Sequence, residues 1–172
     1  MNRNGRPSGR TARVFGMTAA IGILAFAARG EVQVGQALPD LKAAGLEGRL
    51  PDVVGRVVLV DLWASWCAPC RKSFPFLDTL QRDFGPKGFV VLGVNLDDEA
   101  EDMRRFLEAN PVAFAVVRDA SKQYVERLGI DRMPTSLLVD RKGVVRFIHA
   151  GFHEGKTETV LRSEIARLLE EP

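Results

Sequence analysis

The chain holds only two cysteines, Cys67 and Cys70, and both lie in the short stretch DLWASWCAPCRKSFP, residues 61–75. Two cysteines three positions apart, on one turn of chain, can close a disulfide with each other. Such a pair can exchange two electrons with the thiols and disulfides of other molecules. The spacing therefore predicts thiol–disulfide chemistry.

An apolar strand precedes the cysteine pair and a helix follows it. Residues 57–63, VVLVDLW, are rich in β-branched side chains, which is typical of a strand buried on both faces. A helix is predicted from about Cys67 to Phe84, where apolar residues recur at helical spacing and Pro75 should produce a kink. Unpaired N–H groups and the positive dipole at a helix start favour a thiolate, so Cys67 is the expected nucleophile and Cys70 the resolving cysteine.

The rest of the chain alternates strands with helices and then ends in a hairpin and a helix. This order predicts one α/β domain at residues 31–172, in which helices cover both faces of a mixed sheet. An N-terminal hairpin is expected within residues 31–53. Strands are predicted at residues 89–94, 112–117, 135–139 and 144–149, and helices from Asp97 or Asp98 to Pro111, from Ser121 to Gly129, and at residues 156–169.

The first 27 residues have the features of an export signal. They contain four arginines and no acidic residue, residues 14–28 are apolar, and the sequence AFA precedes the expected cleavage point after Ala27. We predict a signal peptide at residues 1–27, with an uncleaved membrane anchor at residues 14–28 as the alternative. Either arrangement places the domain in a periplasmic or other extracytoplasmic compartment, where cysteine pairs can be oxidised.

The charge of the chain gives no reason to expect a nucleic-acid partner. The formal net charge of +2 depends on the four arginines near the N-terminus, and the remainder holds slightly more acidic than basic residues. The domain is also long enough to bury its own core, so we expect a monomer.

Three other uses of the cysteine pair remain open. A structural disulfide is one, although closing a two-residue loop restrains the unfolded chain very little. A zinc site is another, but it needs about four ligands and the chain adds only His149 and His153, which we interpret as structural or surface residues. A thiol peroxidase is the third, and it would depend on one activated cysteine. The sequence predicts no metal and no cofactor.

Three segments carry a resemblance to a known family. LVDLWASWCAPCRKSFP, GIDRMPTSLLVDRKGVV and HAGF resemble the TlpA-like (ResA/TlpA/DsbE-type) thiol-disulfide oxidoreductases of the thioredoxin-like superfamily. The likeness runs from about residue 50 to residue 152. It implies a thioredoxin-like fold with a central mixed sheet flanked by helices, and a helix and strand inserted between the two halves at about residues 98–118.

The resemblance also implies roles for residues around the cysteines. Asp61 matches the buried acid of thioredoxin, which takes or gives the proton of the inner cysteine, and burial should raise its pKa. Pro134 matches the cis-proline that faces the cysteine pair, so that Met133 would offer its backbone to a substrate strand. The alternatives are a solvated strand-end aspartate and an ordinary trans proline. Trp66 and Pro69, within or beside the CxxC turn, are expected to contact the substrate.

The sequence departs from the family pattern at two places. Relatives often carry glutamate three residues after the second cysteine, where this chain has Ser73, and this difference weakens the transfer of a cytochrome-maturation role. Many exported relatives have asparagine where this chain has Asp61, so at this position the chain resembles thioredoxin more than it resembles those relatives. Arg71 and Lys72 add positive charge near the site, with a modest and salt-dependent effect on the thiolate.

The resemblance implies an exported protein-disulfide reductase that acts through Cys67 and Cys70. Its implied roles are cytochrome c maturation and extracytoplasmic redox homeostasis. The expected partners are exported proteins with disulfides, apocytochrome c among them, and a membrane thiol-disulfide electron donor. The alternative is a thioredoxin-like binding module for apocytochrome or for copper delivery, beside the peroxidase already named.

Overall fold

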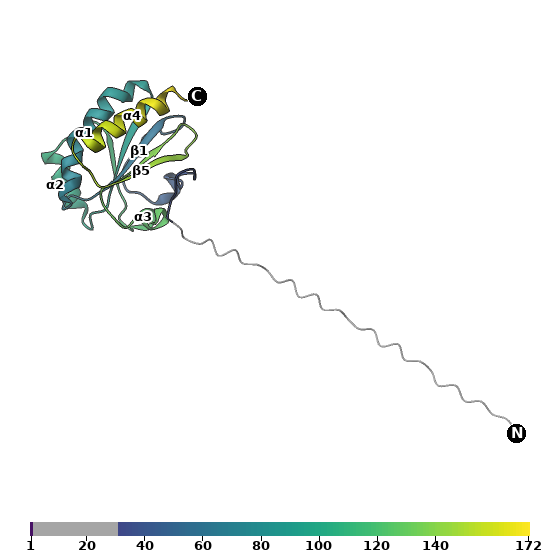
Figure 1. Ribbon diagram of the computed structural model, residues 1–172. Helices are drawn as coiled ribbons and strands as arrows, with labels where there is room; N and C mark the ends of the chain where they lie inside the picture. Colours follow the sequence, from purple (N-terminus) through teal and green to yellow (C-terminus); the bar gives the residue numbers. More distant parts are fainter. Residues whose placement is uncertain (2–30) are drawn as a thin grey trace.

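The computed structural model describes Met1 and residues 31–172 (Figure 1). The predicted signal peptide at residues 1–27 and the alternative anchor at residues 14–28 lie, apart from Met1, outside the described residues. Within the described part of the chain, no helix has the length and apolar character needed to cross a bilayer.

A five-stranded mixed sheet forms the centre of the domain, with the strand order β3-β2-β1-β4-β5. The first three strands in the chain run parallel to one another, and β4 and β5 are antiparallel to their neighbours. All seven residues of the central strand β1 are buried. The strands are β1 (Val57–Trp63), β2 (Phe89–Asn95), β3 (Ala115–Arg118), β4 (Thr135–Val139) and β5 (Val145–Ala150).

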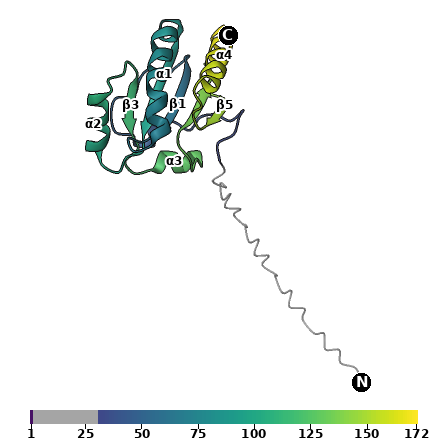
Figure 2. The same cartoon turned by 60° about the vertical axis from the view of Figure 1, so that its left-hand side comes forward.

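Helices cover both faces of this sheet (Figures 1 and 2). Apolar side chains of α1, α2 and α4 pack in one cluster against one face, and those of α3 and the N-terminal segment pack against the other. The thioredoxin-like arrangement expected from the sequence is thus confirmed, with α2 and β3 in the place of the expected insert. The helices are α1 (Ala68–Phe84), α2 (Ala100–Ala109), α3 (Gln123–Leu128) and α4 (Lys156–Glu170).

Aromatic packing fixes α1 and α2 on the face of the sheet that lies below the cysteines. The ring of Trp63, at the end of β1, lies 4.4 Å from that of Phe74 and 5.1 Å from that of Phe106, measured between centroids. Gly93 of β2 provides the space, because a Cβ there would lie only 3.1 Å from Nε1 of Trp63. The packing holds the start of α1, and therefore the cysteines, above the end of β1.

The predicted N-terminal hairpin is wrong. Residues 31–56, the described part of the chain before β1, contain only a short 3-10 turn at Lys42–Ala44 and two single bridges, one between Ala37 and Val144 and one between Glu47 and Arg118. Its backbone therefore pairs with distant parts of the sheet rather than with itself. Apolar side chains of the segment are buried on the α3 face, which explains why it folds without strands.

Two predicted helix caps are also wrong. Helix α2 begins after Glu99, which makes no side-chain capping hydrogen bond, while Asp97 is buried elsewhere. Helix α3 begins after Lys122 rather than Ser121. The cap of α3 at Gly129, the β4–β5 hairpin and the C-terminal helix are confirmed.

Candidate active site

The redox site lies where β1 passes into α1. The backbone of Cys67 is extended and forms the N-cap of α1, and its Sγ accepts the N–H of Cys70 at 3.3 Å. The two sulfurs are bonded at 2.07 Å, so the predicted pairing is confirmed. A sulfur at this position faces the unpaired N–H groups of the first helical turn, which stabilise an anion.

The two cysteines differ in their access to solvent. Cys70 is fully buried, whereas Cys67 retains 6% of its surface. Pro69 lies exposed on the turn between them, and Trp66 beside them is 67% exposed. Cys67 and Trp66 are therefore more accessible to solvent than Cys70.

Asp61 lies in β1, where successive side chains point to opposite faces of the sheet. Val58 and Val60 belong to the cluster on the α3 face, so the side chain of Asp61 points to the face that α1 covers. It is 1% exposed, and Oδ1 accepts the hydroxyl of Ser136 at 2.6 Å. Its Oδ2 has no hydrogen-bond partner among the described residues. Burial raises the pKa of Asp61 to about 7, and the hydrogen bond from Ser136 opposes that rise. This carboxyl can therefore gain or lose a proton near neutral pH.

The loop before β4 forms the other side of the site. The bond between Met133 and Pro134 is cis, as the resemblance implies, and Pro134 is buried. Met133 and Trp66 line the same surface cavity of about 290 Å³, with Leu96 and Ile130 among its apolar residues. The structure thus brings Trp66 and Met133 to one cavity, whereas Pro69 and Pro134 are not among its lining residues.

Two contributors to the site were missed at the sequence level. Ser136 was not singled out, although a hydroxyl within the apolar strand TSLLV signals a polar partner in the core. Asp97 was interpreted as a possible helix cap, yet it binds the backbone of Ser65 in the turn before the cysteines. Both contacts join segments that are far apart in the sequence.

Three other polar side chains named in the sequence analysis have partners within the fold. The buried hydroxyl of Ser73 donates to the carbonyl of Cys70 at 2.8 Å. Lys72 forms a distant, exposed ion pair of 3.9 Å with Glu154. His149 contacts Glu164 at 2.6 Å, where β5 meets α4.

Comparison with known proteins agrees with this geometry. A family model described as Redoxin matches residues 33–165, which is more than half of the chain. The chain belongs to the redoxin family. It is 31% identical over 129 residues to the thiol-disulfide oxidoreductase ResA of Geobacillus thermodenitrificans, covering 73% of this chain and 74% of the relative. It is 30% identical to ResA of Geobacillus kaustophilus, covering 94% and 92% respectively.

Solved structures support the same placement for this redoxin-family chain. A crystal structure assigned as a thiol:disulfide interchange protein DsbE, from Chlorobium tepidum, matches with a TM-score of 0.75 and 38% identity. The match covers 81% of this chain and 99% of that one. With its CxxC pair at bonding distance, the chain is a thiol-disulfide oxidoreductase of the ResA and DsbE type.

Proposed function

We propose that the chain is a protein-disulfide reductase that acts on exported proteins outside the cytosol. The observation that supports the proposal is the different burial of the three groups. Cys67 lies at the helix N-cap and is partly accessible, whereas Cys70 and Asp61 are buried, Asp61 in the strand that α1 covers. Each group sits in a different environment, and each environment suits a different step of thiol–disulfide exchange.

The first step belongs to Cys67. Its thiolate attacks one sulfur of a substrate disulfide, so that a mixed disulfide forms and the other substrate sulfur leaves as a thiolate. Trp66 and Met133 are the proposed contacts for the substrate around this sulfur, and Pro69 and Pro134 shape the turn and the loop that face it. The exposure of Trp66 supports this role.

The second step belongs to Cys70 and Asp61. The buried thiol of Cys70 gives its proton to Oδ2 of Asp61, and the resulting thiolate attacks Sγ of Cys67. The second substrate sulfur leaves with its electrons, and the bond between Cys67 and Cys70 closes. Two electrons have then passed from the chain to the substrate. The pKa of Asp61 near 7 supports its assignment as the proton carrier.

The oxidised chain must be reduced again before another turnover. A membrane thiol-disulfide electron donor is the proposed source of electrons, and the arginine-rich, apolar start of the sequence supports export to the compartment where such a donor would act. Exported proteins with disulfides are the proposed substrates, and apocytochrome c is one to test, because its haem-binding motif contains a cysteine pair.

Trapping the mixed disulfide tests the order of the two cysteines. Cys70→Ser removes the resolving thiol, so the reduced full chain should accumulate a covalent adduct with a disulfide substrate, released by dithiothreitol. Cys67→Ser is the matched control and should form no adduct. Adducts formed through Cys70 instead, or rapid peroxide consumption by Cys70→Ser without adducts, would contradict the proposal.

The direction of electron flow is tested by the reduction potential. Equilibration with dithiothreitol or glutathione redox buffers should give a value in the range of thioredoxin, about −270 mV. A value near −120 mV, typical of a strong oxidant, would make the chain an oxidase of thiols in spite of its acid at position 61.

A further inference from the structure

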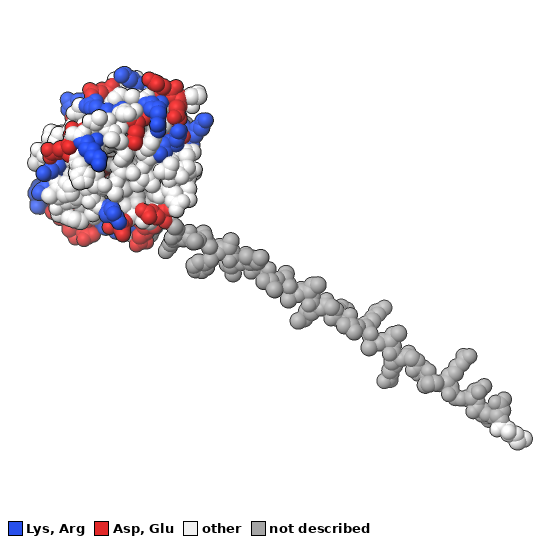
Figure 3. Space-filling view, viewed as in Figure 1, with Lys and Arg blue, Asp and Glu red and all other residues white. Residues whose placement is uncertain are grey.

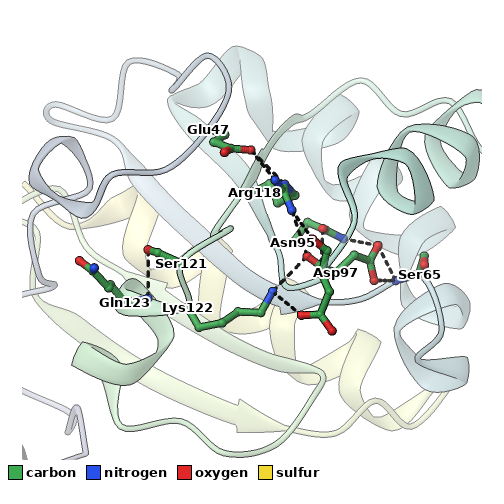
Figure 4. A network of polar contacts seen from close by, with 9 residues as sticks. Glu47, Ser65, Asn95, Asp97, Arg118, Ser121, Lys122 and Gln123 are labelled. Carbon is green, nitrogen blue, oxygen red and sulfur yellow. Dashed lines mark hydrogen bonds and ion pairs between the residues drawn. The ribbon is translucent and has the colours of Figure 1, made fainter.

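Asp97, in the loop between β2 and α2, contacts Ser65 in the turn that precedes the cysteines (Figure 4). It is 1% exposed, and its two carboxylate oxygens accept the backbone N–H of Ser65 at 2.9 and 3.2 Å. Oδ2 also accepts Nδ2 of Asn95 at 2.9 Å, and the N–H of Asp97 donates to Oδ1 of Asn95. Because a carboxylate with several donors has one favoured orientation, it also holds the Ser65 amide in place.

Two cations fix this loop from its other side. Nη1 of Arg118 donates to the carbonyl of Asp98 at 2.7 Å, and the same guanidinium pairs with Glu47 at 2.9 Å. Nζ of Lys122 donates to the carbonyl of Asp97 at 3.0 Å and lies 3.2 Å from the carboxylate of Asp98. Figure 4 shows both cations reaching the loop from β3 and the start of α3.

The backbone of Lys122 adds an independent sign that the network serves the site. Its φ of 59° is the only positive value among the non-glycine residues of the described part of the chain. This left-handed conformation is unfavourable for a residue with a side chain, and such outliers cluster at functional sites. Here it occurs at the residue whose amino group binds the loop.

The same loop forms one wall of the cavity that Trp66 and Met133 line. The N–H of Leu96 donates to the carbonyl of Trp63 at 2.8 Å, and the N–H of Cys67 donates to the carbonyl of Ala64 at 3.1 Å. Trp66 is the one exposed residue between Trp63 and Cys67, and it lines the cavity together with Leu96. The position of the indole relative to the cavity therefore depends on how firmly the turn is held.

We propose that Asp97 is a positioning residue for substrate binding. By holding the Ser65 amide, it fixes Trp66 beside Leu96 and keeps the cavity open for an apolar side chain next to the substrate disulfide. The inference rests on the proposed reductase function and names the feature of the substrate that this site selects.

Kinetics of Asp97→Asn in the full chain test the proposal. Asparagine keeps the shape of aspartate, but only one of its two terminal atoms can accept a hydrogen bond, so the Ser65 N–H and the Asn95 side-chain amide would compete for a single oxygen. With insulin as the disulfide substrate and dithiothreitol as the final reductant, KM should rise about tenfold while kcat stays within about twofold. The reaction of the reduced protein with 5,5′-dithiobis(2-nitrobenzoate), a small disulfide that does not need the cavity, should change less than about twofold.

Asp140→Asn is the matched control, because the Asp140 carboxylate likewise binds backbone, accepting the N–H groups of Lys142 and Val144, but lies at the opposite end of β4 from Pro134. It should leave KM for insulin unchanged. An unchanged KM in Asp97→Asn would overturn the proposal, as would an equal rise in Asp140→Asn or an equal loss with the small disulfide. Failure of the wild type to reduce insulin would instead contradict the proposed function.

Hydrogen exchange of the wild type provides a test that needs no variant. The Ser65 amide should exchange at least about tenfold more slowly than in an unstructured peptide, because its N–H is bound to a buried carboxylate. Exchange at the unstructured rate would overturn the proposal even if Asp97→Asn failed to fold.

Discussion

Two buried aspartates lie beside the redox turn, and their surroundings differ sharply. Asp61 and Asp97 are each 1% exposed, yet Asp61 accepts one hydrogen bond, from Ser136, while Asp97 accepts from both Ser65 and Asn95. One oxygen of Asp61 has no partner among the described residues, and burial raises its pKa to about 7. The number of donors thus separates a carboxyl suited to proton transfer from one suited to holding a loop.

One face of the domain carries charges of both signs. On the face shown in Figure 3, basic and acidic side chains are interspersed around an uncharged area rather than gathered by sign. Burial is the largest cause of the raised pKa of Asp61, and no charged neighbour contributes to that rise.

Asp61→Asn should give the largest effect on stability. The pKa of Asp61 rises from 3.8 to about 7 on folding, so between these values the folded state holds a proton that the unfolded state has lost. The free energy of unfolding of the wild type therefore falls as pH rises from about 4 to 7, by up to about 4 kcal/mol. Urea denaturation should find Asp61→Asn more stable than the wild type by about 2–4 kcal/mol at pH 8 and nearly equal to it at pH 4.

The same variant should lose activity while it gains stability. If Asp61 is the proton carrier that we propose, insulin reduction by Asp61→Asn at pH 7 should fall about 100-fold, the lower end of the usual contribution of a positioned acid or base. A variant that is stabilised but fully active would show that Asp61 is buried without taking part in proton transfer.

Asp97→Asn should change stability in the opposite direction. One of the donors that now face the carboxylate would meet an amide N–H₂ group instead, at a cost of about 1–3 kcal/mol in the free energy of unfolding. Urea denaturation at pH 8 should therefore rank Asp61→Asn above the wild type and Asp97→Asn below it. The same sign for both variants would remove the distinction drawn between the two carboxyls.

Ser136→Ala should have the smallest effect of these variants, a change in the pKa of Asp61. The hydroxyl lowers the pKa of Asp61 by stabilising the charged form, so its loss should raise that pKa further. The matched control is Thr135→Val, which removes the neighbouring hydroxyl that donates to the carbonyl of Arg132. Carboxyl titration by NMR should show the shift in Ser136→Ala alone.

The local sequence pattern was sufficient to predict β1 and α1, the strand and helix that flank the cysteine pair. The continuous apolar run of β1 and the helical spacing in α1 depend on residues close together in the chain, so both elements were predicted within one residue of their ends. The chemistry followed in turn, because a CxxC pair at a strand-to-helix junction needs no distant contact to define it.

Contacts between segments that are far apart in the sequence could not be predicted from the local pattern. Ser136 meets Asp61 only through the antiparallel register of β1 and β4, across 75 positions, and Asp97 meets Ser65 across 32. The prediction for residues 31–53 was wrong for the same reason, since this segment pairs with distant parts of the chain, as in the hydrogen bond from the N–H of Val32 to the carbonyl of Leu128. Local propensity cannot reveal a segment that is stabilised by the far side of the fold.

The titration of Asp61 itself is the most direct test of this account. Carbon-13 NMR of the carboxyl groups, followed from pH 3 to 9 in the full chain with its disulfide intact, should show one aspartate that titrates near pH 7 and disappears in Asp61→Asn. If every aspartate signal instead titrates below about pH 5, the buried proton carrier does not exist.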